Sequence, residues 1–190
     1  MTGIAGIAII VFISIVFIFI WVAYNKLVKQ KNLISEAWGA LDITLKKRHE
    51  LIPNLIAVVK GISEHEKELF TEISKWRSKA MQSEDKSSKE EAENNLSISI
   101  GKISVVMENY PNLVSGPNYL KLQDQLMEIE DEISYARRYY NGTIRNNNIL
   151  IESFPSNLIA NMFDFQMPPF FEIEISSEKQ APILNFDDEE

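Results

Sequence analysis

Apolar residues fill the beginning of the chain almost without interruption. Nearly every residue from Ile4 to Ala23 is apolar, and the first charged side chain is Lys26. Twenty helical residues span about 30 Å, the thickness of the hydrocarbon core of a bilayer. Because a lone segment in lipid must satisfy its own backbone hydrogen bonds, the pattern predicts a transmembrane helix over residues 4–24, preceded by a short extracytoplasmic segment, residues 1–3.

The residues around this segment favour an uncleaved anchor with a defined orientation. No basic residue precedes it, no small-residue cleavage site follows it, and it is longer than the apolar core of a signal peptide. Aromatic and basic residues suited to the membrane interface stand at its end: Trp21, Tyr24, Lys26, Lys29 and Lys31. By the positive-inside rule, we expect the N-terminus outside and the C-terminal domain in the cytoplasm of a single-pass cell-membrane protein.

Beyond the anchor, apolar residues recur at alternating spacings of three and four. This apolar series runs from Leu27 to Ala80, and only Lys31, Arg48 and Glu66 interrupt it with charge. Such a repeat is typical of long helices packed nearly parallel to one another. We expect one helix to continue through the series, kinked rather than broken at Pro53. The alternative is a new helix after a capping box at residues 63–66.

Two further long helices follow from the same spacing. Residues 81–88 are polar and aperiodic and predict a loop, with Ser88 and Glu91 forming the capping box of the next helix. That helix extends to Tyr110, and another occupies most of residues 119–153. Short turns between long amphipathic helices predict an all-α fold, in which the transmembrane helix continues into an antiparallel up-and-down bundle of three to four long helices.

The end of the chain lacks this periodicity. Residues 166–190 are rich in Pro and Phe and finish with four acidic residues. We therefore expect a helical bundle domain over residues 25–165 and an extended aromatic and acidic tail over residues 166–190. The aromatic side chains of the tail either pack over one end of the bundle or dock onto another protein.

Several short stretches of the chain form a combination with a defined order and spacing. They are Arg48–Asn54 (RHELIPN), His65–Glu66, Glu108–Pro111 (ENYP), Ala136–Asn141 (ARRYYN) and Ser153–Asn157 (SFPSN), with Tyr24–Asn25 after the anchor and Phe171–Glu172 near the end. In sequence, order and spacing they resemble the LemA family, and the resemblance covers nearly the whole chain. It implies a single-pass membrane protein with a small outward N-terminus and a helical bundle, and it brings no established molecular activity.

Composition and missing motifs exclude several classes of function. The chain has 190 residues, with 19 Lys and Arg against 27 Asp and Glu, and a net charge of −8 argues against nucleic-acid binding. Without cysteine there is no disulfide, thiolate zinc site or cysteine nucleophile. Neither a glycine-rich phosphate loop nor a nucleophile elbow is present in the sequence.

Two acidic motifs lack the partners that a metal site needs. His65 and Glu66 begin a metalloprotease-like motif, but position 69 is Leu where the second histidine would stand. The acidic residues around Glu130 lack the Glu-x-x-His spacing of di-iron bundles. We expect no catalytic residue, no metal and no cofactor, and hence no enzyme.

Polar residues inside or beside the apolar series are more informative. Charges that face a core are costly unless they are paired, so we expect Arg48 and Arg137 to meet carboxylates from among Glu66, Glu108 and Glu130. The predicted structural polar network comprises Arg48, Asn54, His65, Glu66, Glu108, Glu130, Arg137, Tyr140, Asn141 and Asn148.

These observations leave two functional hypotheses. The first is a membrane-anchored, non-catalytic adaptor or scaffold, with the lipid bilayer bound through residues 4–24, a protein partner at the membrane, and self-association possible. The alternative is a ligand-binding protein or cryptic metalloenzyme that uses the polar network around Arg48, Arg137 and Asn141. A structure in which those groups pair with each other favours the first.

Overall fold

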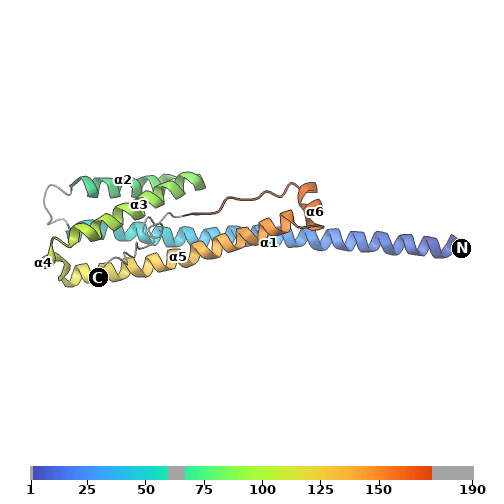
Figure 1. Cartoon of the computed structure of the whole chain (residues 1–190), viewed down its shortest axis with the longest axis horizontal. Helices are drawn as coiled ribbons and strands as arrows, with labels where there is room; N and C mark the ends of the chain where they lie inside the picture. Colours follow the sequence, from blue (N-terminus) through green and yellow to red (C-terminus); the bar gives the residue numbers. More distant parts are fainter. Residues whose placement is uncertain (1, 60–66, 173–190) are drawn as a thin grey trace, which may run out of the picture. The chain divides into compact units, whose positions relative to one another are not determined.

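The computed structural model of the protein describes residues 2–59 and 67–172 (Figure 1). Over these ranges the chain is helical and contains no strand. The helices are α1 (Thr2–Val59), α2 (Lys67–Gln82), α3 (Lys86–Met107), α4 (Pro111–Val114), α5 (Pro117–Glu152) and α6 (Ser156–Met162). The all-α fold, with a long apolar N-terminal helix and packed helices, is as the sequence predicts.

The chain divides into two compact units. Unit 1 comprises Met1–Ile43 and Ile133–Phe171, and unit 2 comprises Thr44–Glu132 and Glu172–Glu190. The two longest helices, α1 and α5, each contribute residues to both units. Each unit has its own hydrophobic core.

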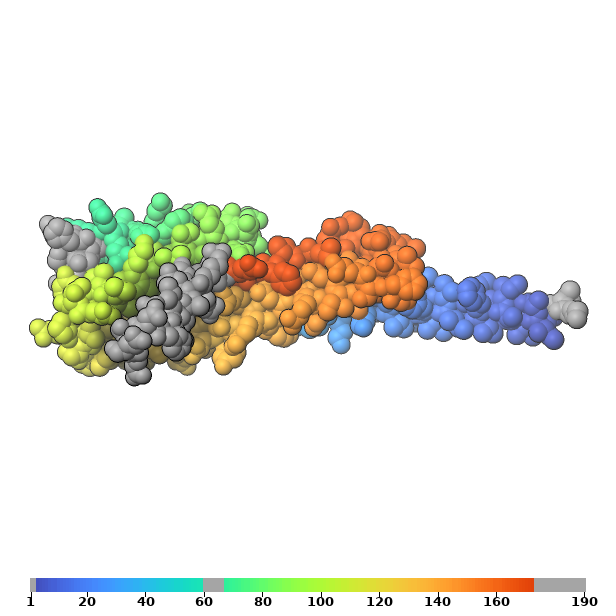
Figure 2. Space-filling model, viewed as in Figure 1, coloured from blue at the N-terminus to red at the C-terminus, as the bar shows by residue number. Residues whose placement is uncertain are grey.

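The described residues leave the N-terminal part of α1, in unit 1, without protein cover. It is long and apolar enough to cross a membrane, and none of its most apolar stretch is buried. Phe12 and Phe17 are 67% and 64% exposed, and Figure 2 shows this stretch in blue with its side chains on the surface. An apolar helix without protein cover is a form that lipid stabilises and water does not.

The core of unit 1 begins where the apolar stretch ends. Ala23 and Leu27 of α1 pack with Ile151 of α5 and with Ile159 and Ala160 of α6. Further along, the Gln30 side chain donates a hydrogen bond of 2.8 Å to the carbonyl oxygen of Thr143. Because residue numbers rise on α1 as they fall on α5, the two helices are antiparallel in this unit.

A tight reversal of the backbone ends α6. Asp164 has a positive φ of 53°. The N–H of Phe165 donates to the carbonyl of Ala160 at 3.0 Å, and the N–H of Asp164 donates to that of Asn161 at 3.4 Å, the two bonds of a Schellman motif. The ring of Phe163 lies 4.8 Å from that of Tyr24, and the ring of Phe165 lies 6.0 Å from it.

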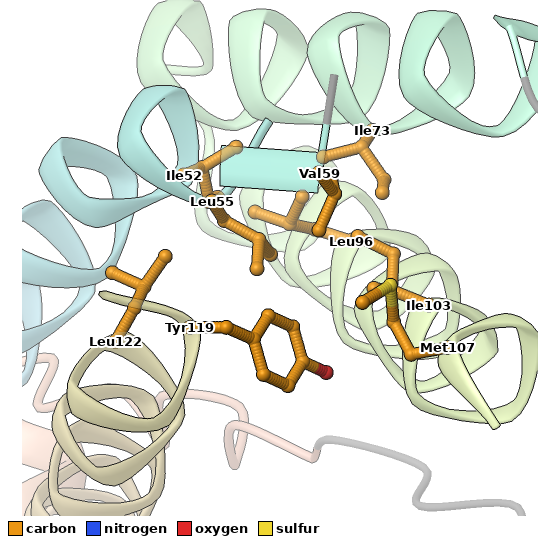
Figure 3. Close-up of a cluster of buried hydrophobic side chains, with 9 residues drawn as sticks. All are labelled: Ile52, Leu55, Val59, Ile73, Leu96, Ile103, Met107, Tyr119 and Leu122. Carbon is orange, nitrogen blue, oxygen red and sulfur yellow. The ribbon is translucent and has the colours of Figure 1, made fainter. Parts of the chain in front are cut away.

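Unit 2 is a helical bundle with an apolar cluster in its core (Figure 3). The cluster consists of Ile52, Leu55, Val59, Ile73, Leu96, Ile103, Met107, Tyr119 and Leu122, which come from α1, α2, α3 and α5. Ion pairs align α2 against α3, with Lys79 Nζ 2.9 Å from Glu91 and Lys102 Nζ 3.3 Å from Glu72. These pairings make α2 and α3 antiparallel neighbours.

The expectation of one continuous helix from Leu27 to Ala80 is wrong. The Arg77 side chain donates a hydrogen bond of 2.7 Å from Nε to the carbonyl oxygen of His49. Along one straight helix these residues would stand about 42 Å apart, so α2 runs back along α1. Helix α1 does pass through Pro53 without a break. The alternative start at residues 63–66 lies outside the described residues.

The predicted loop at residues 81–88 is also too long. Helix α2 extends to Gln82, and α3 begins at Lys86, so only three residues separate the two helices. The N-cap of α3 is Asp85, whose carboxylate accepts a hydrogen bond of 2.9 Å from the N–H of Ser88. Asp is a strong N-cap residue, and this cap replaces the predicted box of Ser88 and Glu91.

Candidate functional site

A cluster of charged side chains lies inside unit 2. Arg48 of α1 is fully buried, and its guanidinium contacts Glu93 of α3 and Glu130 of α5. Nη2 of Arg48 donates to the Glu93 carboxylate, while Nη1 donates to Glu130 at 2.8 Å and to the Ser97 hydroxyl at 2.7 Å. We call Arg48, His49, Glu93, Ser97 and Glu130 the buried charge cluster; the Glu130 side chain closes its outer edge and is 42% exposed.

His49 completes the coordination of Glu93. Its Nε2 lies 2.8 Å from Oε1 of Glu93, and both side chains are buried. Since an ionised carboxylate only accepts hydrogen bonds, Nε2 carries the proton in this pair. Glu93 therefore receives donors from two adjacent residues of α1.

The pKa shifts in the cluster favour the charged forms. Burial by itself would lower the pKa of Arg48, but the nearby charges and hydrogen bonds of Glu130 and Glu93 raise it above its usual value. Burial would likewise raise the pKa of Glu93. The hydrogen bond from His49 and the charge of Arg48 outweigh it, and the pKa of Glu93 is lowered.

Helical spacing explains why these groups converge. Glu93 and Ser97 are four residues apart, so they project from one face of α3 toward the same guanidinium. Arg48 occupies a position of the apolar series of α1, between the buried Leu45 and Ile52. A charge at such a position enters the core, and two carboxylates there compensate it.

The structure brings only part of the predicted polar network to this cluster. Arg48 and Glu130 meet, whereas Asn54 is exposed on α1 and Glu108 is exposed at the C-cap of α3. The predicted residues His65 and Glu66 lie outside the described ranges.

The remaining network residues, Arg137, Tyr140, Asn141 and Asn148, belong to unit 1. Tyr140 is buried, with its ring 5.4 Å from that of Trp38. Arg137 is half-buried, and Asn148 is half-buried with an Oδ1 that has no hydrogen-bond partner among the described residues.

Asn141 binds the backbone of the C-terminal segment. Its Nδ2 donates to the carbonyl oxygen of Phe171 at 3.0 Å, and its Oδ1 accepts from the N–H of Phe171 at 2.9 Å. Phe171 is 1% exposed, with its ring 5.7 Å from that of Trp38. We call this pair of bonds the Asn141 clamp. At this residue the tail packs on the helices of unit 1.

All five predicted interface residues are exposed on α1: Trp21, Tyr24, Lys26, Lys29 and Lys31. Tyr24 also carries the contacts with Phe163 and Phe165 described above. The aromatic and basic residues thus lie at the boundary between the uncovered and the covered part of α1 within unit 1.

A small hollow adjoins the charge cluster. It has a volume of about 220 Å³ and is lined by Lys46, His49, Glu50, Arg77, Met81 and Lys89. Within the part of the chain that the structure describes, no hydrogen-bond partner reaches Nδ1 of His49. Three cationic side chains against one carboxylate give this hollow a basic character.

Sequence comparison assigns the family. The model of the LemA family matches residues 37–186. The chain belongs to the LemA family. The match begins after the apolar stretch of α1. Every residue of the buried charge cluster lies within the region that the LemA model matches.

Two kinds of relative are similar to this LemA chain. Protein LemA of Metamycoplasma hominis is 26% identical over 159 residues, which cover 83% of the chain and 73% of the relative. Magnetosome protein MamQ 2 of Paramagnetospirillum magneticum is 32% identical over 73 residues, and MamQ of Magnetospirillum gryphiswaldense is 25% identical over 72. These matches span 38% of the chain and only 27% and 26% of the MamQ proteins. Together with the uncovered apolar helix, they support a membrane-associated LemA protein.

Sequence reasoning missed Glu93 and His49 as parts of the cluster. The signal for Glu93 was present, because the positions 93, 96, 100, 103 and 107 follow the spacing of three and four that marks the buried face of α3. His49 carried no such signal. It is buried next to Arg48 because α2 folds back over that part of α1.

Proposed function

We propose that this LemA protein is a membrane-tethered, non-catalytic adaptor or scaffold. The observation that carries the proposal is the pairing of Arg48 with Glu93 and Glu130. The buried charges satisfy one another, and the Arg48 and Glu93 side chains are inaccessible to a substrate. Such a cluster serves to fix the register of α1, α3 and α5, a role that buried polar groups have in coiled-coil-like packing.

The membrane side of the proposal uses α1. Residues 4–24 anchor the protein in the bilayer, the three lysines that follow face the cytoplasm, and residues 25–190 form the cytoplasmic part. The bundle domain covers residues 25–165, and the tail covers residues 166–190. A reporter that is active only outside the cytoplasm, fused after Glu190, tests the orientation, and strong reporter activity would overturn it.

Partner binding is the central consequence of a scaffold. Unit 2 offers an apolar hollow of about 310 Å³ whose lining includes Tyr119, Met127 and Glu130. Met127 is 63% exposed there. A hollow of mixed apolar and acidic lining suits a partner that brings an apolar side chain next to a basic one.

In-cell photo-crosslinking tests this directly. A photoreactive residue at Met127 of the full chain should capture a specific envelope-associated protein, and one at the exposed Lys121 of the same helix should not. The same experiment is repeated after deletion of residues 166–190 and, separately, of residues 173–190. The difference between the two deletions measures what residues 166–172, the Phe171 segment, contribute to partner capture. Recovery of no specific protein from any of these variants would contradict the scaffold.

A second candidate function is binding of a small anion beside the cluster. The basic hollow beside His49 favours it, because three cationic side chains, Lys46, Arg77 and Lys89, line it against the single carboxylate of Glu50. Calorimetric titration of the full chain with inorganic phosphate tests this candidate. Binding that Lys89→Gln weakens and Lys121→Gln leaves unchanged would support it, and absence of heat with the unaltered protein would dispose of it.

A further inference from the structure

We propose that residues 153–163, which we call the α6 segment, form a second membrane-inserted element beside the anchor. Their exposed apolar side chains would lie among the lipid acyl chains of the leaflet from which α1 emerges into the cytoplasm. The inference rests on the membrane insertion of α1 proposed above, and it adds a contact that fixes how unit 1 meets the bilayer.

The composition of the α6 segment is that of an interfacial element. No charged residue stands between Glu152 and Asp164. Phe154, Leu158 and Met162 are 80%, 56% and 68% exposed. Ile159 and Ala160 of the same helix are buried against α1 and α5. The segment therefore has one face in the protein and an outer face that carries the exposed apolar side chains beside the exposed Asn161.

The packing of α6 fixes its level along the anchor. Within unit 1 it lies beside α1 (Figure 1), in a core that reaches Ile20 and Ala23. Phe163 lies next to a more N-terminal part of the anchor. Together with Phe17, Ile20, Trp21 and Tyr24 it lines an apolar hollow of about 190 Å³. If the apolar stretch of α1 lies in hydrocarbon, Phe163 lies at the hydrocarbon boundary with it.

The structure satisfies some of the polar groups of the segment internally, although the Asn161 side chain is exposed and the buried Oδ1 of Asn157 has no hydrogen-bond partner among the described residues. The hydroxyl of Ser156 donates within the protein, to the carbonyl oxygens of Leu150 at 2.7 Å and Ser153 at 3.0 Å. The Schellman bonds at the end of α6 use the carbonyls of Ala160 and Asn161. Satisfying backbone groups internally is what lipid demands of an inserted segment.

Lipid is the occupant that these observations favour. A soluble partner or a second copy could cover an isolated apolar patch, but this one is continuous with the uncovered anchor through Trp21 and Phe163. Whatever surrounds the anchor at Phe17 to Tyr24 also meets the exposed side of Phe163, which is 48% exposed. In a bilayer that surrounding is lipid.

The experiment uses single cysteines, because the natural chain has none. Full-length Val22→Cys, Met162→Cys and Tyr139→Cys variants carry an environment-sensitive fluorophore in lipid nanodiscs, and doxyl-labelled lipid is the quencher. Val22 reports the anchor, and Tyr139 is a matched control: it is 50% exposed in the same unit but about 20 Å before the end of α5. We expect several-fold stronger quenching at positions 22 and 162 than at 139.

Each other outcome is decisive. Quenching at 22 without quenching at 162 overturns the inference and leaves the anchor intact, whereas absence of quenching at both overturns the anchor itself. Equal quenching at 139 and 162 overturns a contact confined to α6. Efficient oxidative dimerisation of Met162→Cys would show that a second copy, not lipid, covers the segment, and would also overturn the inference.

Discussion

Arg48 on α1 and Glu93 on α3 form an ion pair in which neither side chain is exposed to solvent. Removing two charges from water is costly. The hydrogen bond that Arg48 donates to Ser97 and the one that His49 donates to Glu93 offset part of that cost. A pair of this kind adds little net stability over apolar residues, but breaking it leaves a buried charge without a partner.

Loss of one member should therefore destabilise unit 2 strongly. We expect Arg48→Met to reduce the free energy of unfolding by about 3–5 kcal/mol, since Glu93 remains buried without its guanidinium partner and keeps only the hydrogen bond with His49. The double variant Arg48→Met, Glu93→Leu should recover most of the loss. Denaturant unfolding of the full chain in detergent micelles, followed by circular dichroism, measures both.

The neighbouring residue provides a matched control. Lys47 pairs with Glu132 at 2.9 Å, but their side chains are 51% and 40% exposed. Lys47→Met should change the free energy of unfolding by about 1 kcal/mol or less. Equal effects of Lys47→Met and Arg48→Met would contradict the importance of burial.

Acid should destabilise unit 2 through Glu93. Because its pKa is lowered in the folded state, ionised Glu93 contributes stability that is complete above the ordinary glutamate pKa of about 4.3. That contribution is lost as the pH falls through the folded value. Thermal melts between pH 7 and pH 3 should show this loss in the unaltered protein. Glu93→Gln should have a lower melting temperature at pH 7, and that temperature should fall less between pH 7 and pH 3. An unchanged fall would contradict the assignment of the acid effect to Glu93.

The Asn141 clamp should control access to the Phe171 segment. Asn141→Asp still accepts from the N–H of Phe171 but cannot donate to its carbonyl oxygen, and Asn141→Leu makes neither bond. We expect chymotrypsin to cleave after Phe170 and Phe171 fastest in Asn141→Leu, more slowly in Asn141→Asp and slowest in the unaltered protein. The exposed Asn146 supplies the control, since Asn146→Leu should leave the cleavage rate unchanged.

Pro53 should cost α1 stability. It stands inside a continuous helix on the exposed side, between Ile52, which is buried, and the exposed Asn54. Its missing N–H and its ring disfavour a helix interior by about 3 kcal/mol. Pro53→Ala should raise the unfolding midpoint, and Asn54→Ala should raise it less. A lower midpoint for Pro53→Ala would contradict this expectation.

The buried faces of the helices could be predicted from spacing alone. Positions chosen because they recur every three or four residues are buried in the structure, including Leu27, Leu41, Leu45, Ile52, Leu55 and Val59 on α1. This works because the apolar stripe of a helix follows from its geometry, whatever the partner is.

The direction of the chain could not be predicted in the same way. The apolar series keeps its phase from Val59 to Ile73 although α2 runs back along α1. Two helices that line one core share the same spacing whether they are continuous or folded back, so phase does not distinguish these arrangements. A contact such as that of Arg77 with His49 does.

The candidate site was predictable only in outline. A charge at a core position requires a counter-charge, which identified Arg48 and Glu130. Glu93 is one of several acidic residues in the first turns of α3. Only its spacing of three residues from the apolar Leu96 indicates that it lies on the buried face. Its partners come from helices distant in sequence, and spacing within one helix carries no information about them.

The left-handed backbone at Asp164 also limits which residues evolution can place there. A side chain branched at Cβ is strained at a φ of 53°, whereas Gly, Asn and Asp adopt it readily. A saturation library at this codon should accordingly retain those three and reject Val and Ile, although the Asp164 side chain itself is exposed. The selectivity would come from the main chain. The backbone must reverse at Asp164 so that the rings of Phe163 and Phe165, on either side of it, can both contact Tyr24.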